Sequence, residues 1–146
     1  MFKNDNSKAT GKLTVEIKND KGVVIETREV KNLVVDDGLE YIADRMKNNS
    51  TVMSHMAIGT GSTAAAASDT ALGTEAARVA LTSTTVTANA VAYVASFGAG
   101  TGTGAITEAG ILNAGSSGTL LCRTVFSVVN KGASDSMTIT WTVTIS

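Results

Sequence analysis

The stretch Ser136–Ser146, SMTITWTVTIS, has the most regular pattern in the chain. Apolar side chains alternate with threonines, and a period of two residues is typical of a β-strand with one buried and one polar face. The apolar positions are Met137, Ile139, Trp141, Val143 and Ile145, and the polar ones are Thr138, Thr140, Thr142 and Thr144. The stretch therefore predicts a strand that places Trp141 in the core.

Strand patterns continue along most of the chain. KLTVEIK (12–18) and VVIETREV (23–30) flank NDKG, a turn whose residues tolerate positive φ, and together they predict a β-hairpin. Further strands are expected at MSHMAIG (53–59), RVALTSTTVTA (78–88), AVAYVASF (90–97), GAITEAGILNA (104–114) and TLLCRTVFSVV (119–129). About eight strands result. We expect a mainly β fold, an antiparallel β-sandwich or jelly-roll-like domain with one short helix.

The helix is expected in DDGLEYIADRMKNN (36–49), where the alternation breaks. Its apolar residues are spaced at i, i+3, i+4 and i+7, which predicts one buried helical face. They are Leu39, Ile42, Ala43 and Met46. Asp37 and Glu40 have the spacing of a capping box, and Asp36 and Asp37 complement the positive end of the helix dipole, so we interpret these carboxylates as structural.

The length of 146 residues fits a single domain with one core. We expect a polar N-terminal arm at residues 1–10 and a single β-rich domain at 11–146. Within that domain, residues 11–50 form the hairpin and helix, and residues 51–146 form the sandwich core, with the strands from Arg78 to Ser146 as a self-consistent unit. The small-residue loop from Gly59 to Glu75 is long enough to indicate a functional segment, or one that orders when bound.

Charge and hydropathy argue against two classes of partner. Twelve basic and thirteen acidic residues give a net charge of -1, and no cluster of lysine or arginine resembles a nucleic-acid-binding surface. The apolar runs are shorter than the roughly 18 residues that span a bilayer, and the N-terminus lacks the apolar centre of a signal peptide. We therefore expect a soluble protein made in the cytoplasm, with no direct nucleic-acid partner and no membrane partner.

Glycines at every second position mark the stretch SFGAGTGTGAITEAGI (96–111). A phosphate-binding P-loop needs a lysine after its last glycine, and none follows here. The dinucleotide fingerprint needs a third glycine and then a helix, whereas Thr107 and a strand pattern stand there. The sequence therefore favours a sharp bend or a close approach of two backbone segments, which glycine permits.

Three other residues could carry chemistry, and each is expected to be structural. Cys122 shares a strand face with Leu120, Thr124, Phe126 and Val128 in a period-two pattern, which favours a buried thiol. His55 has no second ligand-type residue near it. Glu108 shares a face with Ile106 and Gly110 in a regular strand, and we expect a partly buried carboxylate paired with Arg78 or Arg123. No catalytic, cofactor-binding or metal-binding residue is predicted, and the chain is not expected to be an enzyme.

Three segments together resemble a known group of proteins. They are SHMAIGTGSTAAAASDTALGTE (54–75), GTGTGAITEAGILNA (100–114) and CRTVFSVVNKGASDSMTITWTVTIS (122–146). With AIGTG, TEAGI and a closing TITWT strand, they resemble small virion proteins of tailed bacteriophages, of the capsid decoration (cement) or tail-fibre-like kinds. The resemblance covers about residues 50–146, and it implies an assembly role without catalytic residues.

The resemblance makes a capsid decoration protein the leading expectation. Such a protein would sit on the capsid surface of the virion, after synthesis in the host cytoplasm, and would bridge major capsid protein subunits, as a homotrimer. The alternative is a tail or fibre component, either an adaptor or a receptor-binding tip. A small hydrolase is a weak third hypothesis, because no nucleophile, base and orienting group can be placed together.

Overall fold

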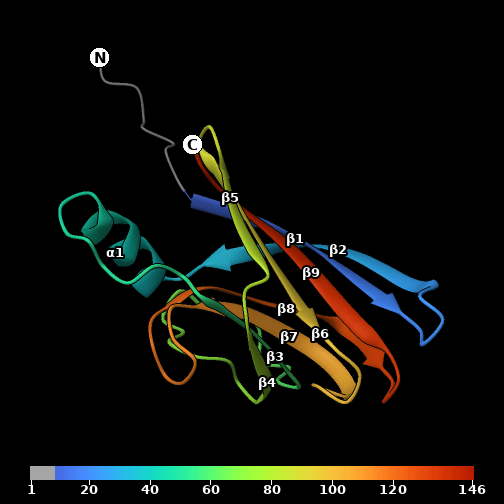
Figure 1. Ribbon diagram of the computed structural model, residues 1–146. Coiled ribbons are helices and arrows are strands. Elements are labelled where there is room, and N and C mark those ends of the chain that lie inside the picture. Colours follow the sequence, from blue (N-terminus) through green and yellow to red (C-terminus); the bar gives the residue numbers. More distant parts are fainter. Residues whose placement is uncertain (1–8) are drawn as a thin grey trace.

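The computed structural model describes residues 9–146, which form nine strands and one helix (Figure 1). All nine strands belong to one antiparallel sheet with the order β4-β3-β7-β8-β2-β1-β9-β6-β5. The elements are β1 (Ala9–Lys18), β2 (Val24–Val34), α1 (Asp36–Arg45), β3 (His55–Gly59), β4 (Glu75–Ala80), β5 (Ser83–Thr87), β6 (Ala90–Phe97), β7 (Gly104–Leu112), β8 (Leu120–Lys131) and β9 (Ser136–Ile145). The mainly β class is confirmed, whereas a sandwich of two separate sheets or a jelly roll is not.

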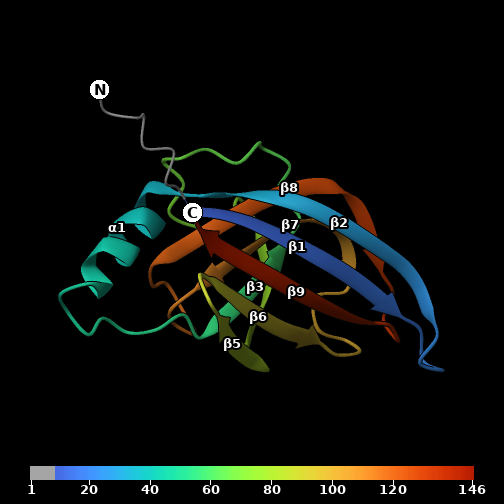
Figure 2. The same ribbon diagram turned by 90° about the horizontal axis from the view of Figure 1, so that it is seen from above.

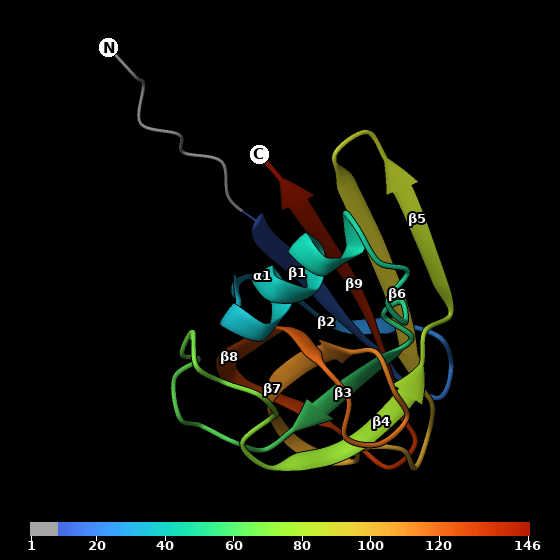
Figure 3. The ribbon, with the colours of Figure 1, turned by 90° about the vertical axis from the view of Figure 1, so that its left-hand side faces the viewer.

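The sheet curls so that its two halves face each other across one core (Figures 2 and 3). β2 belongs to both halves, because it pairs with β1 over most of its length and with β8 through Leu33 and Val34. The segment from β4 to β5 links the halves again. The Leu81 amide donates to the Ser54 carbonyl at 2.9 Å, and the next amide, Thr82, donates to the Val94 carbonyl at 2.7 Å. The expected strand 78–88 is therefore two strands, which raises the count to nine in the described chain.

Trp141 lies in the core with no exposed surface, as the alternating pattern predicts. On β9 it stands opposite Leu13 of β1 and Tyr93 of β6. Side chains from the other half of the sheet belong to the same cluster of buried residues, among them Ile58 and Ile106. We call this set the main cluster. Both halves of the sheet therefore depend on one apolar interior.

The N-terminal hairpin occupies the middle of the sheet, between β8 and β9. Leu13, Val15 and Ile17 are almost fully buried in the main cluster. The expectation that residues 78–146 form a self-consistent core is therefore wrong, because the hairpin strands β2 and β1 stand between β8 and β9 in the sheet and supply part of the main cluster. β1 already starts at Ala9, so the last two residues of the expected arm belong to the sheet, and residues 1–8 lie outside the described residues.

Helix α1 covers one end of the curled sheet, and of the four apolar residues predicted for its buried face only Ile42 packs against the main cluster. Leu39 and Met46 are exposed, whereas Tyr41 and Ile42 pack against the main cluster. Gly38 is buried because its Cα approaches β8 so closely that an added Cβ would lie 2.0 Å from the Leu121 carbonyl oxygen. The capping box is also wrong, since the N-cap position is held by a valine and no side chain caps the helix.

None of the helical residues in the described range 9–146 forms a segment long and apolar enough to cross a membrane.

The glycine-rich stretch is the turn between β6 and β7, as predicted. Gly100, Gly102 and Gly104 all have positive φ, at 80°, 66° and 139°, a conformation that other residues rarely adopt. The buried Lys131 holds this turn, because its Nζ donates to the carbonyls of Gly98 and Asp135, each at 2.8 Å. The stretch therefore connects two strands and has no helix behind it.

Candidate functional site

A buried carboxylate organises the long loop between β3 and β4, residues 60–74. Glu108 of β7 has no exposed surface. Its Oε1 accepts hydrogen bonds from the amides of Thr74 at 2.7 Å and Gly61 at 3.2 Å, and its Oε2 accepts one from the Gly73 amide at 2.9 Å. One side chain therefore binds the backbone near both ends of the loop and fixes them to the sheet.

Arg123 of β8 completes this network. Its Nε and Nη2 donate to Glu108 Oε2 at 3.1 and 2.8 Å, and Nη2 also donates to the Thr63 carbonyl at 3.0 Å. Its Nη1 donates to Asp69 Oδ2 at 2.8 Å, and Asp69 in turn accepts the Ala66 amide at 2.9 Å. The middle of the loop is thus tied to the same guanidinium. We refer to Glu108, Arg123 and Asp69 as the anchor triad.

The charges of the anchor triad stabilise one another. Burial alone would raise the pKa of Glu108, but the Thr74 amide, Arg123 and the Gly73 amide outweigh it, and the pKa lies below its ordinary value. Asp69 behaves in the same way, since the Ala66 amide and Arg123 hold its pKa down against the effect of burial. Burial lowers the pKa of Arg123, but its two carboxylate partners raise it by more. All three groups are therefore charged near neutral pH.

Glycines make room for the carboxylate. A Cβ added at Gly59 would lie 2.2 Å from the Thr74 carbonyl oxygen and 2.6 Å from Glu108 Oε1. One added at Gly61 would lie 2.7 Å from the same Oε1. The glycines of AIGTG therefore allow a close approach between the loop and the sheet, and the Gly61 amide donates to Glu108 Oε1.

A second apolar cluster lies under the loop, on the face of the sheet opposite the main cluster. It contains Val35, Ala57, Leu72, Leu112 and Leu120. Above it, the outward surface of the loop consists of small residues, which are Ser62, Thr63, Ala64, Ala66, Ala67, Ser68, Thr70 and Ala71. We call these exposed residues the loop surface. The anchor triad and the second cluster together hold this surface in one conformation.

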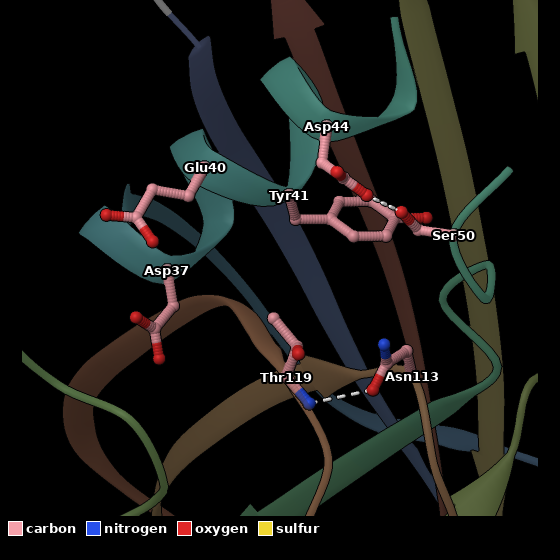
Figure 4. Close-up of a pocket in the computed structure, with 7 residues that line it drawn as sticks. All are labelled: Asp37, Glu40, Tyr41, Asp44, Ser50, Asn113 and Thr119. Atoms are coloured by element: carbon pink, nitrogen blue, oxygen red, sulfur yellow. Dashed lines mark hydrogen bonds between the residues drawn. The ribbon is translucent and has the colours of Figure 1, made fainter. Parts of the chain in front are cut away.

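A hollow of about 520 Å³ lies beside α1 (Figure 4). It is lined by Asp37, Glu40, Tyr41, Asp44, Ser50, Asn113 and Thr119. Asp44 already accepts hydrogen bonds from the Ser50 hydroxyl and from Asn48 Nδ2, and Asn113 Oδ1 accepts the Thr119 amide at 2.7 Å. Within residues 9–146, no three His, Cys, Asp or Glu side chains are grouped so that they could hold a metal ion.

The structure settles several expectations for individual residues. Glu108 pairs with Arg123, one of the two predicted partners, and is fully buried. Arg78 pairs with Glu75 instead, with Nη2 and Oε1 2.7 Å apart. Glu108 shares its face with Gly110 but not with Ile106, because the β7–β8 pairing is irregular between positions 106 and 108 and Ile106 lies in the main cluster.

The structure also shows the surroundings of the two other candidate residues, Cys122 and His55. Cys122 is fully buried, and burial raises the pKa of its thiol. The regular face expected for it is wrong, because Leu120 belongs to the second cluster and Val128 is 47% exposed. His55 lies in β3, where its Nδ1 is 2.8 Å from the Ser54 hydroxyl.

No structural role is predicted from the sequence for two charged residues, Asp69 of the anchor triad and Lys131 at the β6–β7 turn. Asp69 is the only Asp, Glu, Lys or Arg between Lys47 and Glu75, and this isolation was the available signal. Lys131 lies within a polar turn in the sequence and gave no comparable signal. Its burial depends on two carbonyls from separate turns, which only the folded chain brings together.

Comparison of the chain with protein-family models, with curated proteins and with solved structures gives no match.

Proposed function

We propose that this chain is a bacteriophage virion structural protein, and within that class a capsid decoration (cement) protein that bridges major capsid protein subunits. The sequence resemblance of residues 50–146 is the starting point. The observation that carries the proposal further is the anchor triad, which uses the buried charges at Glu108 and Arg123 to fix a loop of small residues. Such a site favours binding of another protein surface over chemistry.

A fixed loop suits this role for an energetic reason. A loop that orders only on binding loses conformational entropy at that moment, and the loss weakens the complex. Here the ordering is already achieved by hydrogen bonds to Glu108 and Arg123. Alanine and serine side chains on the loop surface also allow another backbone to approach closely. We propose the loop surface as the region that contacts the major capsid protein.

The tail or fibre role remains the alternative. A sugar-binding tip needs exposed aromatic rings, and Trp141 is unavailable because it is fully buried. Tyr41 lines the hollow beside α1 and is the aromatic residue best placed for such a role (Figure 4). The chain's location in the virion, its assembly with itself, and its lack of enzymatic activity belong to the same proposal.

Antibody labelling of intact virions of the phage that encodes the chain tests the proposal. An antibody against the folded protein, visualised by immunogold electron microscopy, is expected to label heads. Labelled tails would favour the adaptor or fibre alternative. Virions without any label, from a lysate that contains the protein, would contradict a virion role altogether.

A further inference from the structure

β5 is the last strand of the sheet, and its outer edge pairs with no other strand in residues 9–146. Figure 3 shows it at the margin of the molecule, with β6 on one side only. All five residues, Ser83–Thr87, are exposed, so both of its faces are uncovered as well as its edge. An edge of this kind presents free backbone N–H and C=O groups that can accept another strand.

An apolar row leads from the core onto this strand. Val143 of β9 stands opposite Val91 of β6, which stands opposite Val86 of β5. Opposite residues in antiparallel strands project to the same face, so Val86 extends the core-facing side of the sheet. Val143 is 4% exposed, whereas Val86 is 70% exposed. The core-facing surface therefore continues past the body of the molecule and is uncovered at its end.

The edge lacks the features that commonly prevent strand pairing. Residues 79–107 include no Asp, Glu, Lys, Arg or His, and the chain contains no proline. The pairing of β5 with β6 is regular throughout, without a bulge that would twist the edge away. Edge strands are usually protected by such charges, prolines or bulges. Two copies of this neutral edge can meet without like-charge repulsion.

We propose that two copies of the chain associate by antiparallel pairing of their β5 strands around a two-fold axis. With Thr85 at the axis, Ser83 of one copy faces Thr87 of the other, and Thr84 faces Val86. Each of these pairs is neutral, and Thr84 lies on the same face as Val86 because it stands opposite Tyr93, itself opposite Trp141. Each Val86 is thereby covered by the other copy. This contact does not depend on the proposed virion role.

This contact would form a homodimer, whereas a homotrimer is expected from the sequence. Five residues bury less than the roughly 800 Å² per partner that is typical of stable complexes. Association in solution is therefore weak, with a dissociation constant of about 10 to 1,000 μM. Copies held side by side on a larger surface would pair more completely, because their effective concentration is higher.

Sedimentation equilibrium of the full chain, from about 10 μM to about 1 mM, tests the pairing. The mean mass is expected to rise from 14.9 kDa toward twice that value. Val86→Lys places a charge on the edge and is expected to remain at the mass of one chain. Val23→Lys is the matched control: it adds the same charge at another exposed valine, in the β1–β2 turn, and should associate as the parent does.

Near-UV circular dichroism of the buried Trp141 confirms that each variant is folded. Thr84→Lys, on the same face of β5, replaces Val86→Lys if that variant does not fold. A parent protein that stays at the mass of one chain at about 1 mM would overturn the inference. So would a Val86→Lys protein that associates like its parent, or a mass of three copies. A three-copy mass would leave the proposed virion role intact.

Discussion

Glu108→Gln is expected to destabilise the protein severely, although it replaces only one carboxylate oxygen with an NH₂ group of similar size. The carboxylate accepts three backbone amides and two N–H groups of Arg123 in a fully buried position. The glutamine NH₂ must replace one oxygen, so a donor then faces other donors and the arginine loses its counter-charge. Breaking a buried ion pair by changing one partner costs about 3 to 5 kcal/mol, and we expect a loss of this size.

The assay is urea unfolding followed by fluorescence of Trp141, the only tryptophan in the chain. Arg123→Met and the double variant Glu108→Gln/Arg123→Met complete a double-mutant cycle. The double variant should lose clearly less than the sum of the two single losses, because each single change leaves the same pair broken. Asp69→Asn should lower the free energy of unfolding by a smaller amount, about 1 kcal/mol, because the carboxylate of Asp69 is partly exposed.

Glu29→Gln is the matched control for this experiment. Glu29 is also a strand glutamate in an ion pair, with Lys12, but both side chains are about 60% exposed. Exposed ion pairs contribute about 1 kcal/mol or less to stability, so Glu29→Gln should leave the free energy of unfolding almost unchanged. If Glu108→Gln also costs less than about 1 kcal/mol, or if the two single losses are simply additive, the anchor triad does not hold the loop as described.

Four further outcomes are expected. The folded-state pKa of Glu108 lies below its ordinary value of 4.5, so its ionised carboxylate contributes fully to the free energy of unfolding above that pH, and this contribution is lost as the pH falls. The free energy of unfolding, measured from pH 6 downward, should therefore decrease. Glu108→Gln should remove part of this decrease. Trp141→Ala should cost about 3 to 5 kcal/mol in urea unfolding followed by far-UV circular dichroism, because this variant has no tryptophan left to report by fluorescence. Gly110→Ala should lower the free energy of unfolding by about 1 to 3 kcal/mol, because its added Cβ would lie 2.6 Å from Leu72 Cδ1. A loss below about 0.5 kcal/mol would show that Leu72 and the loop can move to accommodate the methyl group. Calorimetry with ATP, GTP and NAD should detect no binding tighter than about 10 μM, since the glycine-rich turn leads into a strand.

Local patterns predicted the strands well because alternation is a local property. β6 is found at its predicted residues, and Trp141 is in the core. The predicted buried face of the helix is wrong at Leu39 because of a tertiary contact. α1 approaches β8 so closely that Gly38 makes the contact, and the side chain of Leu39 is exposed to solvent. The central place of the hairpin was also hidden, because strand order depends on pairings between distant segments.

The anchor triad was predictable only in part. A lone glutamate in an apolar strand indicated an ion pair, and Arg123 was one of two named partners. The contribution of Asp69 could not be derived, since it reaches Arg123 across 54 positions of sequence through a loop with no periodic pattern. The irregular pairing near residue 107, which turns Ile106 away from Glu108, likewise follows from the fit of β7 to β8.

Amide hydrogen exchange at Gly61, Gly73 and Thr74 tests most directly whether the loop is held in one conformation. All three amides donate to Glu108, although two of the three residues are themselves exposed. The account predicts slow exchange at these amides in the parent and at least tenfold faster exchange in Glu108→Gln, which corresponds to about 1.4 kcal/mol of local stability. The Leu81 amide, bonded to Ser54 outside the loop, reports whether the whole fold has loosened. Exchange in the parent at the rate of an unstructured peptide would contradict the account.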